Sequence, residues 1–414
     1  MRSQIGYLAG LLIGNSHLQG TSHQNLILGK GRLGQMSKNL LRILTIASML
    51  LAGSIAAVEP AVAGISYQVS FNSNYGSGVM ARATIPSTGK ALPLAKFIRD
   101  DFKFLGWSIT KNGPVKYKNR AVIKPKSKLT LYAQWQSKVT APELFGHNIG
   151  NLLWSDSFSG TTGSKVSSAN WTTRYCGHDA SNGGGSCWGE SQYYYPDAIR
   201  LDQGNAVITT NRITTKPVNV NVGECLAAPC LFTSGRFDTQ GKVSFKYGYI
   251  ETRMKMPVGG TNWPAFWALG DSMTDVGWPL AGEIDIAEQG GDRPTRASSA
   301  VHFSNIDLAD CCDNHRYVVG ELVGVANYQT DFHTYGLAWK PDELEFFVDR
   351  ELMFTAPRDN IGENYWAFNA PFFLIFDNAT GPFGGSYTGW QSSQTLIDYV
   401  RVWQLDGKGT VIKH

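Results

Sequence analysis

Apolar and polar residues alternate in short runs along most of the chain. Between Tyr249 and Met256, every second side chain from Ile250 onward is apolar or a threonine, and the positions between them are mostly polar. Successive side chains of a β-strand point to opposite faces of a sheet, so this run predicts a strand with one face on a core and the other on a polar surface. Similar runs, separated by turns rich in Gly, Asn, Asp and Pro, continue from Leu152 to Gln404 and predict an all-β sandwich.

A shorter region with the same pattern precedes this sandwich. Residues 67–71 alternate in the same way, as do residues 129–135, and an aromatic segment lies between them. About 70 residues can bury a small core of their own, so residues 64–136 are expected to form a separate β module. The other boundaries place an N-terminal extension with a signal peptide at 1–63, a linker at 137–150, the sandwich at 151–405 and a tail at 406–414.

The N-terminal region has the features of an export signal. Positively charged residues follow Met36, residues 43–57 form an apolar run, and Ala61-Val62-Ala63 fits the small-residue pattern of a cleavage site. Because residues 1–35 show no periodic pattern, Met36 is the expected translation start. The apolar run is shorter than the roughly 20 residues that span a bilayer, so we expect a secreted, extracellular or cell-surface-associated protein without a membrane span.

Charge is distributed unevenly, and this bears on the partners. Residues 64–137 hold 12 basic and 2 acidic residues, whereas residues 138–414 hold 20 basic and 30 acidic residues. A nucleic-acid-binding protein carries a basic footprint on its functional domain, so the acidic sandwich argues against nucleic acid as a partner. The basic module has two interpretations, which are contact with an anionic polymer such as a cell wall and a solvated charged face.

All cysteines lie in the acidic part of the chain, at positions 176, 187, 225, 230, 311 and 312. An even number of cysteines in an exported chain indicates disulfides. The most local pairings are Cys176 with Cys187 and Cys225 with Cys230, whereas the adjacent pair at 311 and 312 has no assigned partner. His315 follows that pair, but zinc ligation is the weaker interpretation in an oxidising compartment.

Three carboxylates occur on one short apolar run. In Glu283-Ile284-Asp285-Ile286-Ala287-Glu288, strand alternation puts Glu283 and Asp285 on one face and both isoleucines on the other. Glu288 is five positions after Glu283, and this odd offset would turn it to the wrong face. A one-residue β-bulge near Ala287 restores the phase, because a bulge inserts one extra residue into a strand. The spacing therefore predicts a bulged strand with three acids on one face.

Such a group of acids is suited to the hydrolysis of glycosidic bonds. A retaining glycosidase uses one ionised carboxylate as nucleophile and one protonated carboxyl group as general acid, and repulsion among neighbouring acids raises the pKa of the one that must stay protonated. Trp263, Trp267 and Trp278 precede the strand. Indole rings are common in cores, but they also stack on the apolar faces of sugars, so the sequence indicates a cleft that binds a polysaccharide.

With these motifs the chain resembles glycoside hydrolase family 16, in its laminarinase-like branch, over about residues 150–405. Further matching segments are 153–158, 190–194, 234–236, 247–253, 331–335, 347–349 and 398–402. The resemblance implies a concanavalin-like jelly-roll sandwich that acts with retention on internal β-linkages, with Glu283 as nucleophile, Asp285 as assisting acid and Glu288 as acid/base. The bulged motif is that of laminarinases and of the agarase and carrageenase relatives.

The preceding module resembles the Listeria-Bacteroides type of repeat, a small β-grasp-like unit. The resemblance rests on residues 69–72, 104–107 and 129–135, which are Val-Ser-Phe-Asn, Phe-Leu-Gly-Trp and Leu-Thr-Leu-Tyr-Ala-Gln-Trp. It implies a spacer or an adhesion unit, present in a single copy.

Other site residues are expected from their position. Arg253 and Glu251 lie on the polar side of a strand near the tryptophans, so they either contact the substrate or form a surface ion pair. His302 follows the carboxylate strand and matches a cleft histidine of the family, the alternative being a structural histidine. Members of the family often bind a structural calcium ion, and the residues that would hold it here are Asp398, Ser157 and Gly204.

Together these observations predict a monomeric, endo-acting retaining hydrolase that cleaves internal β-1,3 or mixed β-1,3/1,4 linkages of glucans and needs no cofactor for catalysis. The alternatives are a galactan hydrolase of the agarase or carrageenase kind, a transglycosylase, and a non-catalytic glucan-binding protein. The presence of both glutamates argues against the last of these. Phe372 to Gly381 departs from the Asn-x-Ala-x-Gly-Gly pattern usual in relatives, and the loop from Ser304 to Val325 is long, so both bear on the substrate.

Overall fold

The computed structural model describes residues 64–175, 190–215, 231–304, 315–324 and 326–414. The expected signal peptide and all six cysteines lie outside the described residues. Within these ranges no helix is long and apolar enough to cross a membrane.

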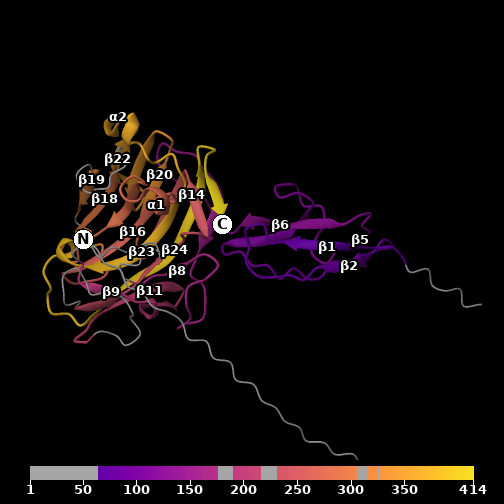
Figure 1. Ribbon diagram of the computed structural model, residues 1–414, viewed down its shortest axis with the longest axis horizontal. Helices are drawn as coiled ribbons and strands as arrows, with labels where there is room; N and C mark the ends of the chain where they lie inside the picture. The colour runs from indigo at the N-terminus through magenta and orange to yellow at the C-terminus, as the bar shows by residue number, and fades with distance from the viewer. Residues whose placement is uncertain (1–63, 176–189, 216–230, 305–314, 325) are drawn as a thin grey trace, which may run out of the picture. The chain divides into compact units, whose positions relative to one another are not determined.

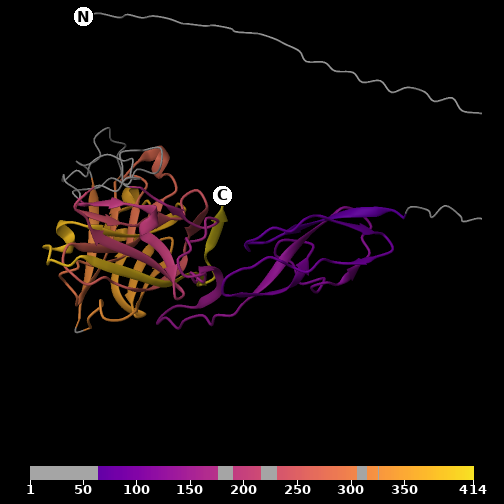
Figure 2. The same ribbon diagram turned by 90° about the horizontal axis from the view of Figure 1, so that it is seen from below.

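The N-terminal module is a four-stranded sheet with a core of its own, coloured indigo to purple in Figures 1 and 2. Its strand order is β2 (Ala83–Pro86), β1 (Ser66–Asn72), β6 (Leu129–Ser137) and β4 (Phe102–Ser108), and a separate pair consists of β3 (Lys90–Ala91) and β5 (Val122–Ile123). Trp107 is fully buried, and the rings of Phe71, Phe97 and Phe104 lie 5.0–6.0 Å from it between centroids. These aromatic residues supply the core that the sequence predicts for the module.

The larger part of the chain is a β-sandwich of two sheets, as predicted from the alternating pattern, and it has the jelly-roll form that the family resemblance implies (Figure 1). One sheet has the order β22 (Glu351–Pro357), β21 (Glu343–Val348), β20 (His333–Trp339), β15 (Gly248–Lys255), β24 (Ser392–Leu405), β11 (Asn205–Arg212), β12 (Phe232–Ser234) and β9 (Gln192–Tyr194), with β10 (Ile199–Asp202) beside β11 and β7 (Ile149–Asp156) beside β24. We call this the outer sheet, because the predicted catalytic residues lie on the other one.

The second sheet, called here the catalytic sheet, carries the carboxylate strand in its interior. Its order is β19 (Arg316–Val323), β18 (Arg296–Phe303), β17 (Glu283–Glu288), β16 (Asn262–Gly270), β23 (Phe372–Thr380), β13 (Arg236–Asp238) and β8 (Thr172–Thr173), with β14 (Val243–Lys246) beside β23 and β25 (Thr410–Lys413) beside β14. The described helices are single turns, namely α1 (Met273–Val276), α2 (Arg358–Ile361), η2 (Pro196–Ala198), η3 (Glu363–Tyr365) and η4 (Pro382–Gly384).

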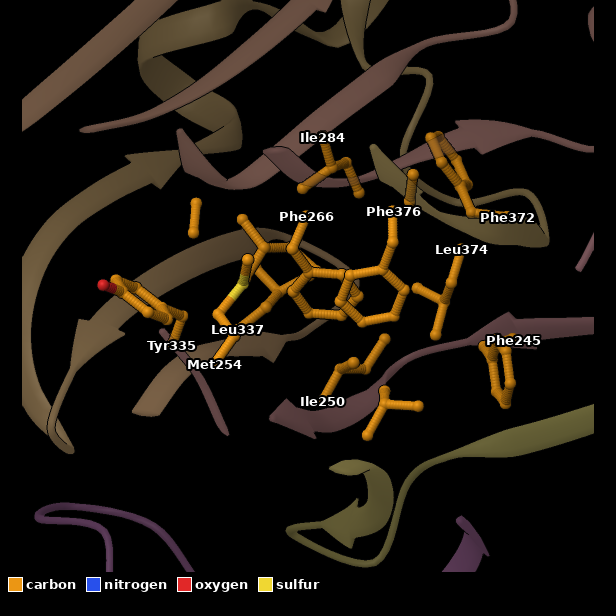
Figure 3. Close-up of a cluster of buried hydrophobic side chains, with 14 of the residues drawn as sticks. Phe245, Ile250, Met254, Phe266, Ile284, Tyr335, Leu337, Phe372, Leu374 and Phe376 are labelled. Carbon is orange, nitrogen blue, oxygen red and sulfur yellow. The ribbon is translucent and has the colours of Figure 1, made fainter. Parts of the chain in front are cut away.

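The main core lies between the two sheets. Phe266 of β16 and Phe376 of β23 are fully buried and stacked, with ring centroids 4.4 Å apart. Figure 3 shows these two rings between Ile284 of the catalytic sheet and Ile250 of the outer sheet. Packing on the inner face of the catalytic sheet therefore fixes the backbone of β17 from behind and leaves its other face for polar side chains.

Strand β15 confirms one half of the sequence prediction and corrects the other. Ile250 and Met254 face the core as predicted, but only the part of the opposite face around Arg253 and Lys255 is a polar surface, because the Glu251 side chain is fully buried. Its carboxylate accepts hydrogen bonds from the Tyr249 hydroxyl at 2.9 Å, the Tyr399 hydroxyl at 2.8 Å and Arg350 Nε at 3.0 Å. The alternation correctly separated the two faces, but it contained no information on the aromatic residues that cover the second one.

Replacement of Phe266 by Ala should destabilise the sandwich by about 3–5 kcal/mol, because it leaves a cavity between the sheets. Phe266→Leu, which keeps most of the apolar volume, should cost clearly less, about 1.5 kcal/mol. Chemical denaturation followed by tryptophan fluorescence measures both. Equal losses for the two variants would contradict the view that close packing behind β17 determines the stability.

Candidate active site

The carboxylate strand contains the predicted bulge. On β16, Phe266 pairs with Ala287 and the next residue, Trp267, pairs with Asp285, so Ile286 has no partner of its own. The pairing of β17 with β18 shifts at the same place. Both Ile286 and Ala287 are buried in the core. The one-residue bulge near Ala287 that the odd spacing required is therefore confirmed.

The bulge brings the three acids to one cleft of about 600 Å³ on the catalytic sheet. Glu283, Asp285 and Glu288 all line this cleft, whereas Ile284 between them is buried on the core side. The other described residues lining the cleft are Glu190, Arg236, Trp263, Ala265, Trp267, Leu269, Met273, Trp278, Ala300, His302, His315, Tyr317, Val319, Glu321, Asp377, Ala379 and Phe383.

The three tryptophans expected in the cleft are all there, but their N–H groups have specific partners. Trp278 Nε1 donates to Glu283 Oε2 at 2.9 Å, and Trp263 Nε1 donates to Glu288 Oε1 at 2.6 Å. Trp267 Nε1 donates to Asp377, another acid of the cleft, at 3.1 Å. Each indole therefore holds an acid in place with its N–H group, and its ring lines the cleft where a sugar ring would pack.

His302 of β18 belongs to the same cluster, as the sequence predicted. It lies opposite Glu283 in the strand pairing, and its Nε2 atom is 3.8 Å from Glu283 Oε1 and 3.1 Å from Asp285 Oδ2. One side-chain atom from each of these three residues lies within 4.8 Å of the others. The histidine thus faces the two acids at the N-terminal end of the motif.

Burial raises the pKa of all three acids, and repulsion by neighbouring acids adds to this rise for Glu283 and Asp285. For Glu283, burial is the largest cause and the charge of Asp285 adds to it, while His302 and the Trp278 hydrogen bond oppose the rise in pKa. For Asp285, burial and then the charge of Glu288 raise the pKa well above its usual value. Burial also raises the pKa of Glu288. Because like charges this close cannot all form cheaply, the cluster retains at least one proton near neutral pH.

Sequence reasoning missed a second group of polar residues at the Glu288 end of the cleft. Asp377 of β23 accepts the Trp267 Nε1 hydrogen bond at 3.1 Å, and burial raises its pKa to about 8 although Arg236 opposes this. Glu190 is half-buried, and the loss of solvent around its carboxyl group raises its pKa to about 7. The motifs containing Glu190 and Arg236 were visible in the sequence, but only the pairing of β13 with β23 shows that Arg236 lies opposite Asp377.

Glu251 and Arg253, the other two expected substrate contacts, lie elsewhere. Both are on β15 of the outer sheet and neither is among the described residues that line the cleft. Arg253 pairs instead with Asp398 at 2.7 Å and lies over the ring of Phe332, so it forms the surface ion pair that was the alternative. Their assignment to the cleft is therefore corrected, because β15 and β16 belong to different sheets although they are adjacent in sequence.

The expected calcium ligands are brought near one another by strand pairing, but the one carboxylate among them is already paired with a guanidinium group. Asp398 follows Ile397, which pairs with Ala206 just after the turn containing Gly204, and Ser157 directly follows Asp156, the partner of Val400. The Asp398 carboxylate accepts a hydrogen bond from Arg253 Nη1. A calcium ion prefers several anionic or carbonyl oxygens and would compete here with a guanidinium group, so these residues do not fit a calcium site.

Comparison with known proteins agrees with this geometry. The profile of glycosyl hydrolases family 16 matches residues 191–401, and that of the Listeria-Bacteroides repeat domain matches residues 67–134. The chain is 30% identical to the glucan endo-1,3-beta-glucosidase of Cryptopygus antarcticus over 280 residues, which is 63% of this chain and 94% of that one.

Two other relatives show the same resemblance. The beta-glucanase of Rhodothermus marinus is 35% identical over 186 residues, which cover 42% of this chain and 63% of that protein, or less than two thirds of its length. Among solved structures, the endo-beta-1,3-glucanase of Pyrococcus furiosus matches with a TM-score of 0.55 and 30% identity, covering 64% of this chain and 98% of that one. The carboxylate cleft, the sandwich fold and these matches together show that the chain belongs to glycosyl hydrolases family 16.

Proposed function

We propose that the protein is an endo-acting hydrolase of β-1,3-linked glucans that works by double displacement with retention of configuration. The observation that carries the proposal is the convergence of Glu283, Asp285 and Glu288 in a cleft lined by three tryptophans. The names of the relatives from Cryptopygus antarcticus and Pyrococcus furiosus support glucan with β-1,3 linkages as the substrate.

In the first step, the Glu283 carboxylate attacks the anomeric carbon and forms a glycosyl ester. The bond from that carbon to the glycosidic oxygen breaks, and the Glu288 carboxyl group donates its proton to the departing oxygen. Burial raises the pKa of Glu288, which favours the protonated form that this step needs. Hydrogen bonding by Trp278 and the nearby His302 ring favour the ionised form of Glu283.

In the second step, Glu288 acts as a base and water hydrolyses the glycosyl ester. The Glu288 carboxylate takes a proton from water, the resulting oxygen attacks the anomeric carbon, and Glu283 leaves as a carboxylate. Asp285 lies beside both glutamates and hydrogen-bonds to Glu283. It can therefore hold the nucleophile in position and exchange a proton with it as the charge on the glutamates changes.

The substrate assignment is tested by measuring reducing ends released from laminarin, mixed-linkage glucan, agarose and carrageenan. We expect turnover on laminarin, on mixed-linkage glucan as well or less, and none on the two galactans. Turnover on galactans alone would replace the glucanase proposal by a galactan hydrolase. Binding of laminarin without turnover would indicate a glucan-binding protein, and transfer products in place of reducing ends would indicate a transglycosylase.

Replacement of Trp278 by Phe should lower kcat by about 10- to 100-fold and move the acidic limb of the kcat/KM profile to higher pH. The Trp278 hydrogen bond lowers the pKa of Glu283, and a hydrogen bond to a charged group contributes about 1.5–3 kcal/mol. Without it the Glu283 pKa rises, so a higher pH is needed to ionise the nucleophile. Measurement of kcat/KM against pH checks the direction of this shift.

Trp267→Phe is the matched control, because it also removes an indole from the cleft but leaves the hydrogen bond to Glu283 intact. The acidic limb that reports Glu283 should stay in place in this variant. A shift of equal size and direction in both variants would show that loss of the ring, and not of the hydrogen bond, is responsible.

We also propose that the chain is exported as a monomer, that it forms disulfides, and that its basic module contacts an anionic polymer. The sequence features given above support this proposal, namely the signal pattern before Gly64, the even number of cysteines and the positive charge of residues 64–137. N-terminal sequencing of the secreted protein tests export, thiol titration tests the disulfides, and light scattering tests the monomeric state. Co-sedimentation of the protein with anionic cell-wall polymer, at low and high salt, tests whether the basic module contacts such a polymer.

A further inference from the structure

Two histidines, and not one, meet at the nucleophile end of the cleft. His302 Nδ1 is 2.7 Å from Nε2 of His315, the residue directly before β19. The two ring planes are only 18° apart and the ring centroids are 5.0 Å apart, so the imidazoles lie edge to edge across this contact. His302 therefore uses its Nδ1 atom for His315 while its Nε2 atom faces Asp285 and Glu283.

This contact determines which nitrogen of His302 carries the proton. In the reacting state Glu283 is ionised and its carboxylate only accepts hydrogen bonds, so the Nε2 atom that faces it carries the hydrogen. In the neutral ring Nδ1 is then an acceptor, and His315 Nε2 must donate to it. The hydrogen bond made by one ring nitrogen fixes the state of the other, so His315 selects the Nε2–H tautomer of His302.

The orientation of the His302 ring matters because its contact with Asp285 is not well aligned. Nε2 is 3.1 Å from Asp285 Oδ2, yet this buried oxygen has no aligned hydrogen-bond donor among the described residues. A small rotation of the imidazole decides whether it receives one. His315 restricts that rotation through its hydrogen bond to the ring.

His315 also contacts Trp278, the second side chain that lies against the Glu283 carboxylate. Its ring lies 4.5 Å from that of Trp278, whose Nε1 donates to Glu283. The Tyr317 ring is also nearly parallel to both imidazoles, with ring centroids 5.6–5.7 Å away. One side chain thus packs against both groups, Trp278 and His302, that favour the ionised form of Glu283.

We propose that His315 is a positioning residue that holds His302 as the Nε2–H tautomer directed at Asp285 and Glu283, and thereby keeps the nucleophile ready for attack. The effect on catalysis rests on the proposed hydrolase function, but the effect on the tautomer does not. Among the described residues, the titratable groups that face the two histidines are the three acids of β17 and the Tyr317 hydroxyl of β19. Burial and the nearby His302 lower the pKa of His315, which favours the neutral ring that can take this role.

The test compares His315→Leu with His315→Gln in the full-length chain. Leucine removes the donor, whereas the glutamine amide can still donate to His302 Nδ1. We expect kcat to fall about tenfold in the Leu variant with little change in KM, because misplacement of a reacting group acts on the chemical step. Its acidic limb should move to higher pH, and the Gln variant should recover most of both effects. Thermal unfolding first confirms that both variants fold like the wild type.

Nitrogen-15 NMR of the histidine side chains gives a second readout that needs no substrate. The His302 signal, assigned by its loss in His302→Gln, should show the Nε2–H tautomer in the wild type and a mixture of tautomers in His315→Leu. An unchanged tautomer in the Leu variant overturns the proposal, as does a folded Gln variant as impaired as the Leu variant. An inactive wild type with the expected NMR change would instead count against the hydrolase function and leave the role of His315 supported.

Discussion

Replacement of Glu283 by Gln should reduce kcat on laminarin by at least about 10⁴-fold while the protein stays folded and still binds the polysaccharide. Removal of a covalent nucleophile elsewhere lowers kcat by up to about 10⁶-fold. The amide keeps the size of the side chain, but it is a very poor nucleophile for the anomeric carbon. Reducing-end release and affinity electrophoresis in laminarin gels measure activity and binding separately.

The structure explains why binding should survive this change. Glu283 has the Trp278 indole as donor and His302 near its second oxygen, so a neutral amide can stay in the same pocket. Repulsion from Asp285 disappears at the same time, since the charge of Asp285 raises the pKa of Glu283. The variant should therefore be at least as stable as the wild type.

Glu351→Gln is the matched control, because it makes the same chemical change at an exposed position of β22 in the outer sheet. It should keep full activity. Loss of binding together with turnover in Glu283→Gln would indicate a disturbed cleft, and substantial remaining turnover would contradict the role of Glu283 as nucleophile.

The face on which each acid lies could be predicted from sequence, because a single strand carries that information. The parity of positions 283 and 288 requires a bulge whatever lies around the strand, and the register with β16 contains it. The tryptophans of β16 could likewise be placed in the cleft, because they adjoin the acids in the chain and share a hairpin-like pairing with them.

Contacts between residues on strands that are distant in sequence could not be predicted in this way. Asp377 and Arg236 meet through the pairing of β23 with β13, and His315 reaches His302 through the register of β18 with β19. The same limitation misplaced Glu251, whose strand neighbours Tyr249 and Tyr399 close its face to solvent. Alternation assigns a face to each residue, but the covering of that face depends on strands that are remote in sequence.

Replacement of Glu288 by Ala should separate two classes of substrate. On laminarin, where the departing sugar oxygen needs a proton, we expect kcat to fall by about 10²- to 10⁴-fold, the usual contribution of general acid catalysis. On an oligosaccharide with an activated leaving group such as a dinitrophenolate, formation of the glycosyl ester needs no acid. A burst of released phenolate should therefore appear at nearly the wild-type rate, followed by slow turnover, because Glu288 is also the base of the second step.

The hydrogen bond to Glu288 supplies the control for this experiment. Trp263 Nε1 donates to Glu288 Oε1 at 2.6 Å and lowers the pKa of the acid against the effect of burial. Trp263→Phe should therefore raise the Glu288 pKa and extend activity on laminarin to higher pH, since Glu288 then stays protonated up to a higher pH. Equal losses on both substrates in Glu288→Ala, without a burst, would contradict the acid/base role, because a residue that only shapes the cleft affects both substrates alike.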